Sequence, residues 1–466
     1  MKDTDIRIRE AEAHFTNERA RKPLWTGSSV VSEAACCHVR VRVENGKGAV
    51  EDGWGAALLA DFWPRPSMVA EHAGQAAVRC FVERLCAEAA DNNEWGHPID
   101  LFVELERRLD PLATVAARDC RLAVGLPYHA ALVASAPVDA ALHDAFGKVN
   151  GISTYEGYGP GYMDHDLAYY LGSEFKGRWL DGFIRPAMLP ELPVFHVVGD
   201  HDRLRAAPEP PDEPHDGLPE SLDRWIEWGN LTCLKLELRG TDLDWDVNRL
   251  LETYAVARET QAALGRNELY LSVGSSNPCG PPDYMIEMLE KVREASPEAH
   301  ERILYIEQPA EQDIHACHHD MRPLSSMKPI LIDESLITMD DFDLAVEWGW
   351  SGIALKSCRG QSMALLFVAK CEAMGLSYTF QDVTNPGLSL LHSTGLAARL
   401  KSLNGFEANG WPDFPAASGP ERAAHPEVFH VRDGKVRTGS LGGSGLGYRM
   451  ERIQRPIFLE SKPAGV

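Results

Sequence analysis

From about residue 192 onward, short apolar runs alternate with longer stretches of helical periodicity. Each run spans five to eight residues and ends in a turn, as expected for strands buried on both faces of a parallel sheet. The eight runs lie at 192–198, 231–238, 269–274, 303–309, 329–335, 352–358, 376–382 and 406–410. Eight strands alternating with helices over about 220 residues predict an α/β fold built on a (β/α)₈ barrel.

The first 150 residues have a different pattern. The alternating stretch CCHVRVRVEN predicts a strand that ends in a turn at Asn45–Gly46, and segments of helical periodicity such as AEHAGQAAVRCFVERLCAEAA follow. Strands followed by helices predict an α+β unit. We therefore expect an α+β domain at 1–150, a connection at 151–191, the barrel at 192–411 and a C-terminal segment at 412–466 that packs on a neighbouring domain.

An open, doubly wound sheet is the structural alternative. It is disfavoured by the strand count and by the lack of a G-x-G-x-x-G turn in the first β–α unit.

Composition narrows the function classes. The 46 basic and 69 acidic residues give a formal net charge of -23, which repels phosphate backbones and anionic lipid surfaces. No apolar run approaches the roughly 20 residues that span a bilayer, and the charged start lacks a signal peptide's apolar core. The ten cysteines show no C-x-x-C spacing. We expect a cytoplasmic enzyme with no nucleic-acid or membrane partner.

Charged side chains collect at the carboxyl ends of the expected barrel strands, where active sites of such barrels form. They are Lys235, Glu237, Glu307, Asp333, Lys356, Asp382 and Glu407. Any one of them could be a rim ion pair or a helix cap. Several converging charges are harder to dismiss, because burying unpaired charge is costly. The pattern therefore predicts a catalytic site at this mouth.

Carboxylates on adjacent strand ends are ligands that suit Mg²⁺. A lysine beside such a cation can act as a general base, because positive charge and burial lower its pKa. Together they suit removal of a proton α to a carboxylate, with the metal stabilising the enediolate.

Five motifs carry a family resemblance. They are VDAALHDAFGKVNG (138–151), LKLELRG (234–240), LYIEQP (304–309), PILIDES (329–335) and ALKSCRG (354–360). In order and spacing the sequence resembles the mandelate racemase/muconate lactonizing branch of the enolase superfamily. The resemblance implies an N-terminal capping domain, a modified barrel, a homo-oligomer, and Mg²⁺-assisted α-proton abstraction from a small-molecule carboxylate, as in dehydratases, racemases and cycloisomerases.

The resemblance also implies residue roles. Glu307 and Asp333 match metal ligands, Lys356 matches a general acid/base, and Lys235 matches the first lysine of the family's K-x-K strand. Trp25 falls where the family has its substrate-specificity loop.

Two departures weaken the match. The third strand, LSVGSSNPCG (271–280), lacks the family's first metal-ligating Asp, which leaves neutral donors such as Asn277 for a weakened Mg²⁺ site. Glu237 stands where the second lysine of K-x-K is expected. Glu237 could serve as a base or within a shifted metal shell, with Asp382 as a substitute acid. Alternatively, Glu237 pairs with Lys356 across the barrel, and the protein is a non-catalytic or metal-independent barrel that binds a small ligand.

Three further features remain open. His201, after the first barrel strand, could contact substrate or lie in an exposed turn, and Glu407 at the eighth strand could also bind substrate. The crowded run 315–320, which holds His315, Cys317 and His319, allows a zinc hydrolase as a third hypothesis, although no second ligand cluster accompanies it.

Overall fold

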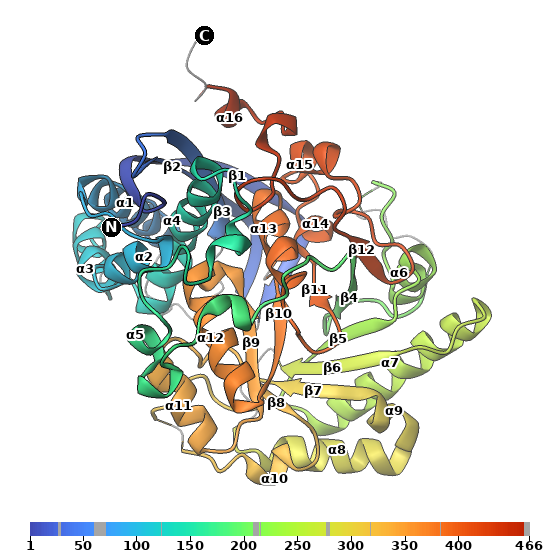
Figure 1. Ribbon diagram of the computed structural model, residues 1–466. Coiled ribbons are helices and arrows are strands. Elements are labelled where there is room, and N and C mark those ends of the chain that lie inside the picture. Colours follow the sequence, from blue (N-terminus) through green and yellow to red (C-terminus); the bar gives the residue numbers. More distant parts are fainter. Residues whose placement is uncertain are drawn as a thin grey trace.

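The computed structural model describes residues 1–26, 29–59, 71–122, 124–207, 214, 216–275, 280–316, 318–382 and 384–460. Eight parallel strands close into a barrel, because the last, β11, pairs with the first, β4 (Figure 1). The barrel strands are β4 (Glu191–Val198), β5 (Cys233–Leu238), β6 (Tyr270–Ser275), β7 (Ile303–Glu307), β8 (Ile330–Ile332), β9 (Gly352–Lys356), β10 (Ser377–Gln381) and β11 (Phe406–Glu407). The predicted barrel is confirmed, and closure excludes the open sheet.

Helices pack around these strands in the described part of the barrel. They are α6 (Leu222–Gly229), α7 (Leu243–Ala263), α8 (Asp283–Ala295), α9 (Pro297–Arg302), α10 (Arg322–Ser325), α11 (Met339–Glu347), α12 (Gln361–Met374) and α13 (Leu388–Ala397). The strands read as near-continuous apolar runs because their outer faces are covered by these helices. Their inner faces pack Phe195, Cys233, Tyr305 and Leu331 into the barrel floor.

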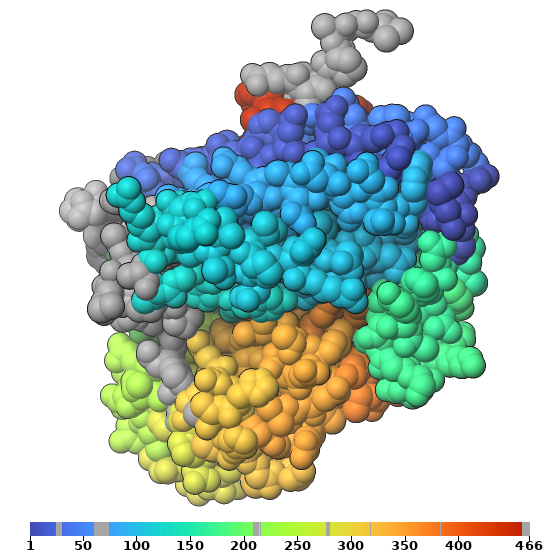
Figure 2. Space-filling model, turned by 90° about the vertical axis from the view of Figure 1, so that its left-hand side faces the viewer, coloured from blue at the N-terminus to red at the C-terminus, as the bar shows by residue number. Residues whose placement is uncertain are grey.

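The N-terminal residues form a second layer. An antiparallel sheet of β1 (Ile6–Thr26), β2 (Ser29–Asn45) and β3 (Val50–Leu59) packs against helices, and we call this unit the cap. Its helices are α1 (Glu71–Asp91), α2 (Pro98–Glu106), α3 (Leu109–Asp119) and α4 (Tyr128–Val149). Figure 2 shows the cap, blue to cyan, lying as a broad layer over the yellow and orange part of the barrel.

A buried polar network joins the cap to the barrel. Asp139 of α4 accepts hydrogen bonds from both the backbone N–H and the hydroxyl of Ser362 at the start of α12, each at 2.7 Å. His143, one turn along α4, contacts the Ser362 hydroxyl at 2.9 Å and the Tyr158 hydroxyl at 2.9 Å. None of these side chains is exposed to solvent. The network therefore fixes how the cap sits on the barrel, because breaking it would leave buried polar groups unpaired.

The chain between cap and barrel contains the short helix α5 (Ala168–Leu171) and several 3₁₀ turns. After the barrel come α14 (Gly410–Asp413), α15 (Gly419–Ala424) and α16 (Pro456–Glu460). A short strand in this segment, β12 (Lys435–Arg437), pairs antiparallel with the first three residues of β4. None of the described helices has the length and apolar character needed to cross a membrane.

Candidate active site

The barrel mouth is built from side chains that alternate along each strand, so that every second residue points inward. Lys235 and Glu237 therefore share the inner face of β5. Three carboxylates converge on the Lys235 Nζ atom: Glu307 of β7 at 2.7 Å, Glu407 of β11 at 3.0 Å and Glu237 at 3.4 Å. We call Lys235 and these three residues the lysine cage.

Electrostatics hold the cage lysine protonated. Burial disfavours its charge, but Glu307 and Glu407 outweigh that effect and raise the pKa of Lys235 well above its usual value. The second oxygen of Glu307 accepts a hydrogen bond from the Gln381 amide of β10. Both Glu307 oxygens are thus engaged by donors from the protein.

A second charged group stands at the ends of β8 and β9. The Asp333 carboxylate forms an ion pair with Lys356, and its other oxygen lies 3.1 Å from Arg359 Nη2. Arg359 Nη1 also donates to the carbonyls of Asp333 and Leu336, at 2.9 and 2.7 Å. Burial alone would raise the pKa of the Asp333 carboxyl, but the two cations hold it well below its usual range. Asp333 in turn raises the pKa of Lys356, against the effect of burial.

The Glu237 carboxylate lies over the neighbouring strand β6. It pairs in register with Gly274 of β6, and a Cβ atom at position 274 would lie 3.2 and 3.3 Å from the two Glu237 carboxylate oxygens. A side chain on β6 would therefore require the Glu237 carboxylate to shift by a few tenths of an ångström. With 26% of its side chain exposed, against 6% for Glu307 and 10% for Glu407, Glu237 is the most accessible carboxylate of the cage. Burial raises the pKa of its carboxyl group.

The residues at the mouth do not fit the Mg²⁺ ion that the resemblance implies. The oxygens of Glu307 and Asp333 are engaged by two ammonium groups, a guanidinium and an amide, and no carboxylate extends from β6. Within the described ranges, no group of three His, Cys, Asp or Glu side chains is arranged to hold a metal ion. Asn277, named as a neutral ligand, lies outside those ranges.

The described side chains of the remaining predicted residues have other partners than Lys235. Asp382 accepts hydrogen bonds from the backbone N–H groups of Gly410 (2.7 Å) and Thr384 (3.0 Å) and therefore ties together the loops after β10 and β11. Burial raises the pKa of its carboxyl group well above the usual value. His201 is 56% exposed and lies beside Asp200 on the loop after β4. The backbone of Trp25 belongs to β1, and its side chain is not among the described ones.

The pairing of Glu237 with Lys356 across the barrel, which was one expectation, is not observed. Glu237 contacts Lys235 on its own strand, whereas Lys356 contacts Asp333 on the adjacent strand. Lys235 lies two residues from Glu237 on the same strand, and Asp333 lies at the end of the strand beside that of Lys356. Both observed partners are therefore nearer than a residue on the opposite wall of the barrel.

Residues 315–320 do not form one cluster in the described part of the chain. His315 contacts Asp341 at 2.7 Å, and His319 contacts Glu311 at 2.9 Å, so the two imidazoles bind different carboxylates. His318 packs against Trp348. Cys317 lies outside the described residues.

Sequence reasoning missed Arg359 and Gln308. Arg359 follows Lys356 by three residues and binds Asp333 from a 3₁₀ turn after β9. Gln308, which has a positive φ of 39°, accepts a hydrogen bond from the Asp333 backbone at 2.8 Å. Gln308 belongs to the LYIEQP motif, so its place directly after Glu307 was the available signal.

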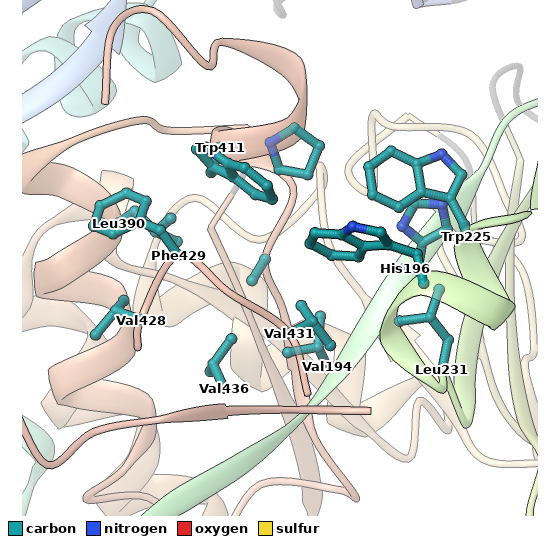
Figure 3. A pocket seen from close by; sticks show the side chains of 13 residues that line it. Val194, His196, Trp225, Leu231, Leu390, Trp411, Val428, Phe429, Val431 and Val436 are labelled. Carbon is teal, nitrogen blue, oxygen red and sulfur yellow. The ribbon is translucent and has the colours of Figure 1, made fainter. Parts of the chain in front are cut away.

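A separate apolar cavity lies on the outer side of the barrel wall. It is formed by β4, α6 and the C-terminal segment, and none of its lining side chains is acidic, lysine or arginine (Figure 3). The His196 and Trp225 rings lie 4.9 Å apart there, and Trp228 stacks on Trp411 at 5.9 Å. Because Phe195 points into the barrel, its neighbour His196 points outward, away from the charged mouth. This cavity therefore has no part in the chemistry of the cage.

No protein-family model matches the sequence, and no curated protein matches it significantly. Solved structures do match over nearly the whole chain. The L-Ala-D/L-Glu epimerase from Bacillus subtilis shares 17% identity over 95% of this chain and 98% of its own, with a TM-score of 0.59. A dipeptide epimerase from Enterococcus faecalis, solved with Mg and the dipeptide L-Leu-L-Tyr, shares 14% over 95% and 99%, with a TM-score of 0.59.

A mandelate racemase/muconate lactonizing protein from Herpetosiphon aurantiacus shares 16% identity over 96% of this chain and 98% of its own, with a TM-score of 0.57. At such low identities the likeness concerns the fold. The resemblance indicated by the strand-end motifs is confirmed at that level: the chain has the cap-and-barrel fold of these proteins.

Proposed function

We infer that this chain is a divergent member of the mandelate racemase/muconate lactonizing branch of the enolase superfamily, and we propose that its mouth removes the α-proton of a small-molecule carboxylate. The shared fold and the strand-end motifs support the membership. The proposed chemistry rests on one observation: Glu237 and Lys356 stand at the same mouth and are held by different partners.

Glu237 is the general base in this proposal. Its carboxylate is the most accessible of the cage, and its raised pKa makes it a stronger proton acceptor than an ordinary surface carboxylate. Lys235 keeps it oriented from the same strand. A base of this kind contributes about 10²- to 10⁴-fold to the rate.

Lys356 is the electrophilic partner. Asp333 raises the pKa of Lys356, so its ammonium is protonated at neutral pH and can stabilise negative charge on the substrate carboxylate as the α-proton leaves. The same ammonium can return a proton to the product. Asp333 pairs with this ammonium, and Arg359 in turn holds the Asp333 carboxylate, so the donor is oriented before the substrate arrives.

The experiment follows solvent exchange rather than a complete turnover. The protein is incubated in D₂O with a panel of 2-hydroxy acids, acid sugars, N-acyl amino acids and dipeptides, and loss of the α-proton signal is recorded by NMR. For a substrate that exchanges, Glu237→Gln is expected to slow exchange by about 10²-fold or more, because the amide cannot accept the proton.

The matched control is Glu227→Gln, the same substitution at an ion-paired glutamate on α6 that is 45% exposed. It is expected to leave exchange unchanged. Full exchange activity in a folded Glu237→Gln variant would remove Glu237 from the mechanism. No exchange with any member of the panel would favour a barrel that binds a ligand without turnover.

A further inference from the structure

The lysine cage resembles a cation-binding site in composition, since several carboxylates surround one positive charge. Here that charge is the ammonium group of Lys235, a side chain of the protein itself. Three carboxylates from three different strands surround one ammonium at 2.7, 3.0 and 3.4 Å, and the Lys235 side chain is 6% exposed. Glu307 accepts a hydrogen bond from this ammonium, and Glu407 and Glu237 lie within ion-pair distance of it. Three carboxylates thus face a cation that the chain itself supplies.

The ion-paired groups of the mouth nearly balance one another in charge without an added ion. The ion-paired groups are three cations, Lys235, Lys356 and Arg359, and four carboxylates, Glu237, Glu307, Glu407 and Asp333. A divalent cation needs oxygen ligands at about 2.0–2.1 Å in the case of Mg²⁺. A metal held by Glu307 and Asp333 would lie beside the positive charges of Lys235, Lys356 and Arg359, which repel it.

The carboxylate nearest to Gly274 of β6 is also held by the lysine. Glu237 lies over Gly274 from the neighbouring strand, and one of its oxygens is 3.4 Å from the Lys235 ammonium.

We propose that the Lys235 ammonium takes the place of a divalent cation in this barrel, so that the mouth is a metal-independent site. The catalytic consequence of this inference rests on the proposed function: charge on the substrate is then stabilised by lysine rather than by a metal. The structural claim itself concerns cation binding and can be tested without any substrate.

The test measures Mn²⁺ binding by calorimetry on chelator-treated protein. The wild-type chain is expected to bind no Mn²⁺ at the cage up to about millimolar concentration, the weak end of protein sites for divalent cations. Lys235→Met removes the internal cation and leaves three carboxylates facing one space. This variant is expected to gain Mn²⁺ binding at least tenfold tighter than any shown by wild type, with a higher melting temperature in Mn²⁺.

The control is Lys370→Met, the same substitution at a buried lysine of α12 that pairs with Asp343 away from the mouth. It is expected to gain no Mn²⁺ binding. If Lys235→Met does not fold alone, folding only with Mn²⁺ supports the proposal. If it folds in neither condition, Lys235→Met combined with Glu407→Gln relieves one charge and is expected to show the same gain.

Two results would overturn the proposal. One is a wild-type Mn²⁺ site that is tighter than millimolar and is lost in Glu307→Gln. The other is a folded Lys235→Met variant, or a folded double variant, that binds no Mn²⁺. Neither result depends on α-proton exchange, so a failure of this inference is distinguishable from a failure of the proposed function.

Discussion

Glu237 and Gly274 lie opposite each other on neighbouring strands. At this level of the mouth the negative charge is therefore on β5, and β6 carries none. A Cβ atom at position 274 would make a tight contact with the Glu237 carboxylate, so the glycine leaves this carboxylate the most room. The two departures noted in the sequence, the missing carboxylate on the third strand and the glutamate on the second, are therefore one spatial arrangement. Sequence alone separates them by 37 positions and gives no sign that they touch.

The identity of the charged residues at the mouth could be predicted from the sequence, whereas their pairing could not. Lys235, Glu307, Asp333 and Lys356 were placed on the correct strand ends by their period of two. Which ammonium meets which carboxylate depends on barrel register and side-chain rotamers, and neither is encoded locally. Asp382 shows the same limit, because its partners are backbone N–H groups of loops.

Asp333 offers a test of the second charged group by stability. Asp333→Asn leaves Lys356 and Arg359 buried without their counter-charge, and removing one partner of a buried pair costs about 3–5 kcal/mol. The free energy of unfolding from urea titration at neutral pH is expected to fall by that amount. The comparison variant Asp244→Asn removes the partner of Lys291 in an exposed ion pair. Such a change should cost less than about 1 kcal/mol. Equal losses in the two variants would contradict the role given to Asp333.

Among the elements, the barrel strands were the most predictable part of the fold. Each of the eight predicted runs overlaps an observed strand, because strands covered on both sides must be apolar throughout. The strand β12 was missed, since three residues with one buried side chain carry no readable pattern. The strand β1 was missed as well, because its sequence is rich in charged residues and carries no clear apolar alternation.

The packing of β3 on α4 depends on two glycines, and this contact gives a test at the level of elements. A Cβ atom at Gly55 would lie 2.1 Å from the Pro137 carbonyl oxygen, and one at Gly53 would lie 2.1 Å from that of Ala141. Backbone atoms cannot move aside as a side-chain end can. Gly55→Ala is therefore expected to lower the free energy of unfolding by about 1–3 kcal/mol or more through overpacking.

Gly151→Ala is not a fair control for that change, because Gly151 has a positive φ of 66°. Gly182→Ala is the better comparison, since a Cβ atom there meets no other atom within 4 Å and the backbone is unstrained. It should leave stability almost unchanged. If Gly55→Ala and Gly182→Ala had the same free energy of unfolding, the close contact between β3 and α4 would not limit the residue at position 55.

For the whole molecule, acid stability depends on histidines buried in their neutral form where the cap meets the barrel. His392 is 2% exposed and contacts the Gln361 side chain at 2.8 Å, and burial lowers its pKa to about 4. The unfolded chain protonates the same group near pH 6.5. Between these values the unfolded state binds more protons than the folded state, so stability falls as the pH falls.

The acid effect is measured as a difference because other groups oppose it. Asp413, whose pKa burial raises to about 7, holds its proton longer in the folded state and stabilises the fold as the pH falls. Comparing wild type with His392→Gln isolates the histidine. Between pH 7.5 and pH 5, the stability advantage of wild type over the variant in urea titrations is expected to shrink by about 2 kcal/mol, since one pKa unit is about 1.4 kcal/mol. A difference in free energy of unfolding that stays constant over this range would contradict the prediction. It would mean that His392 is protonated in the folded protein as readily as in the unfolded chain.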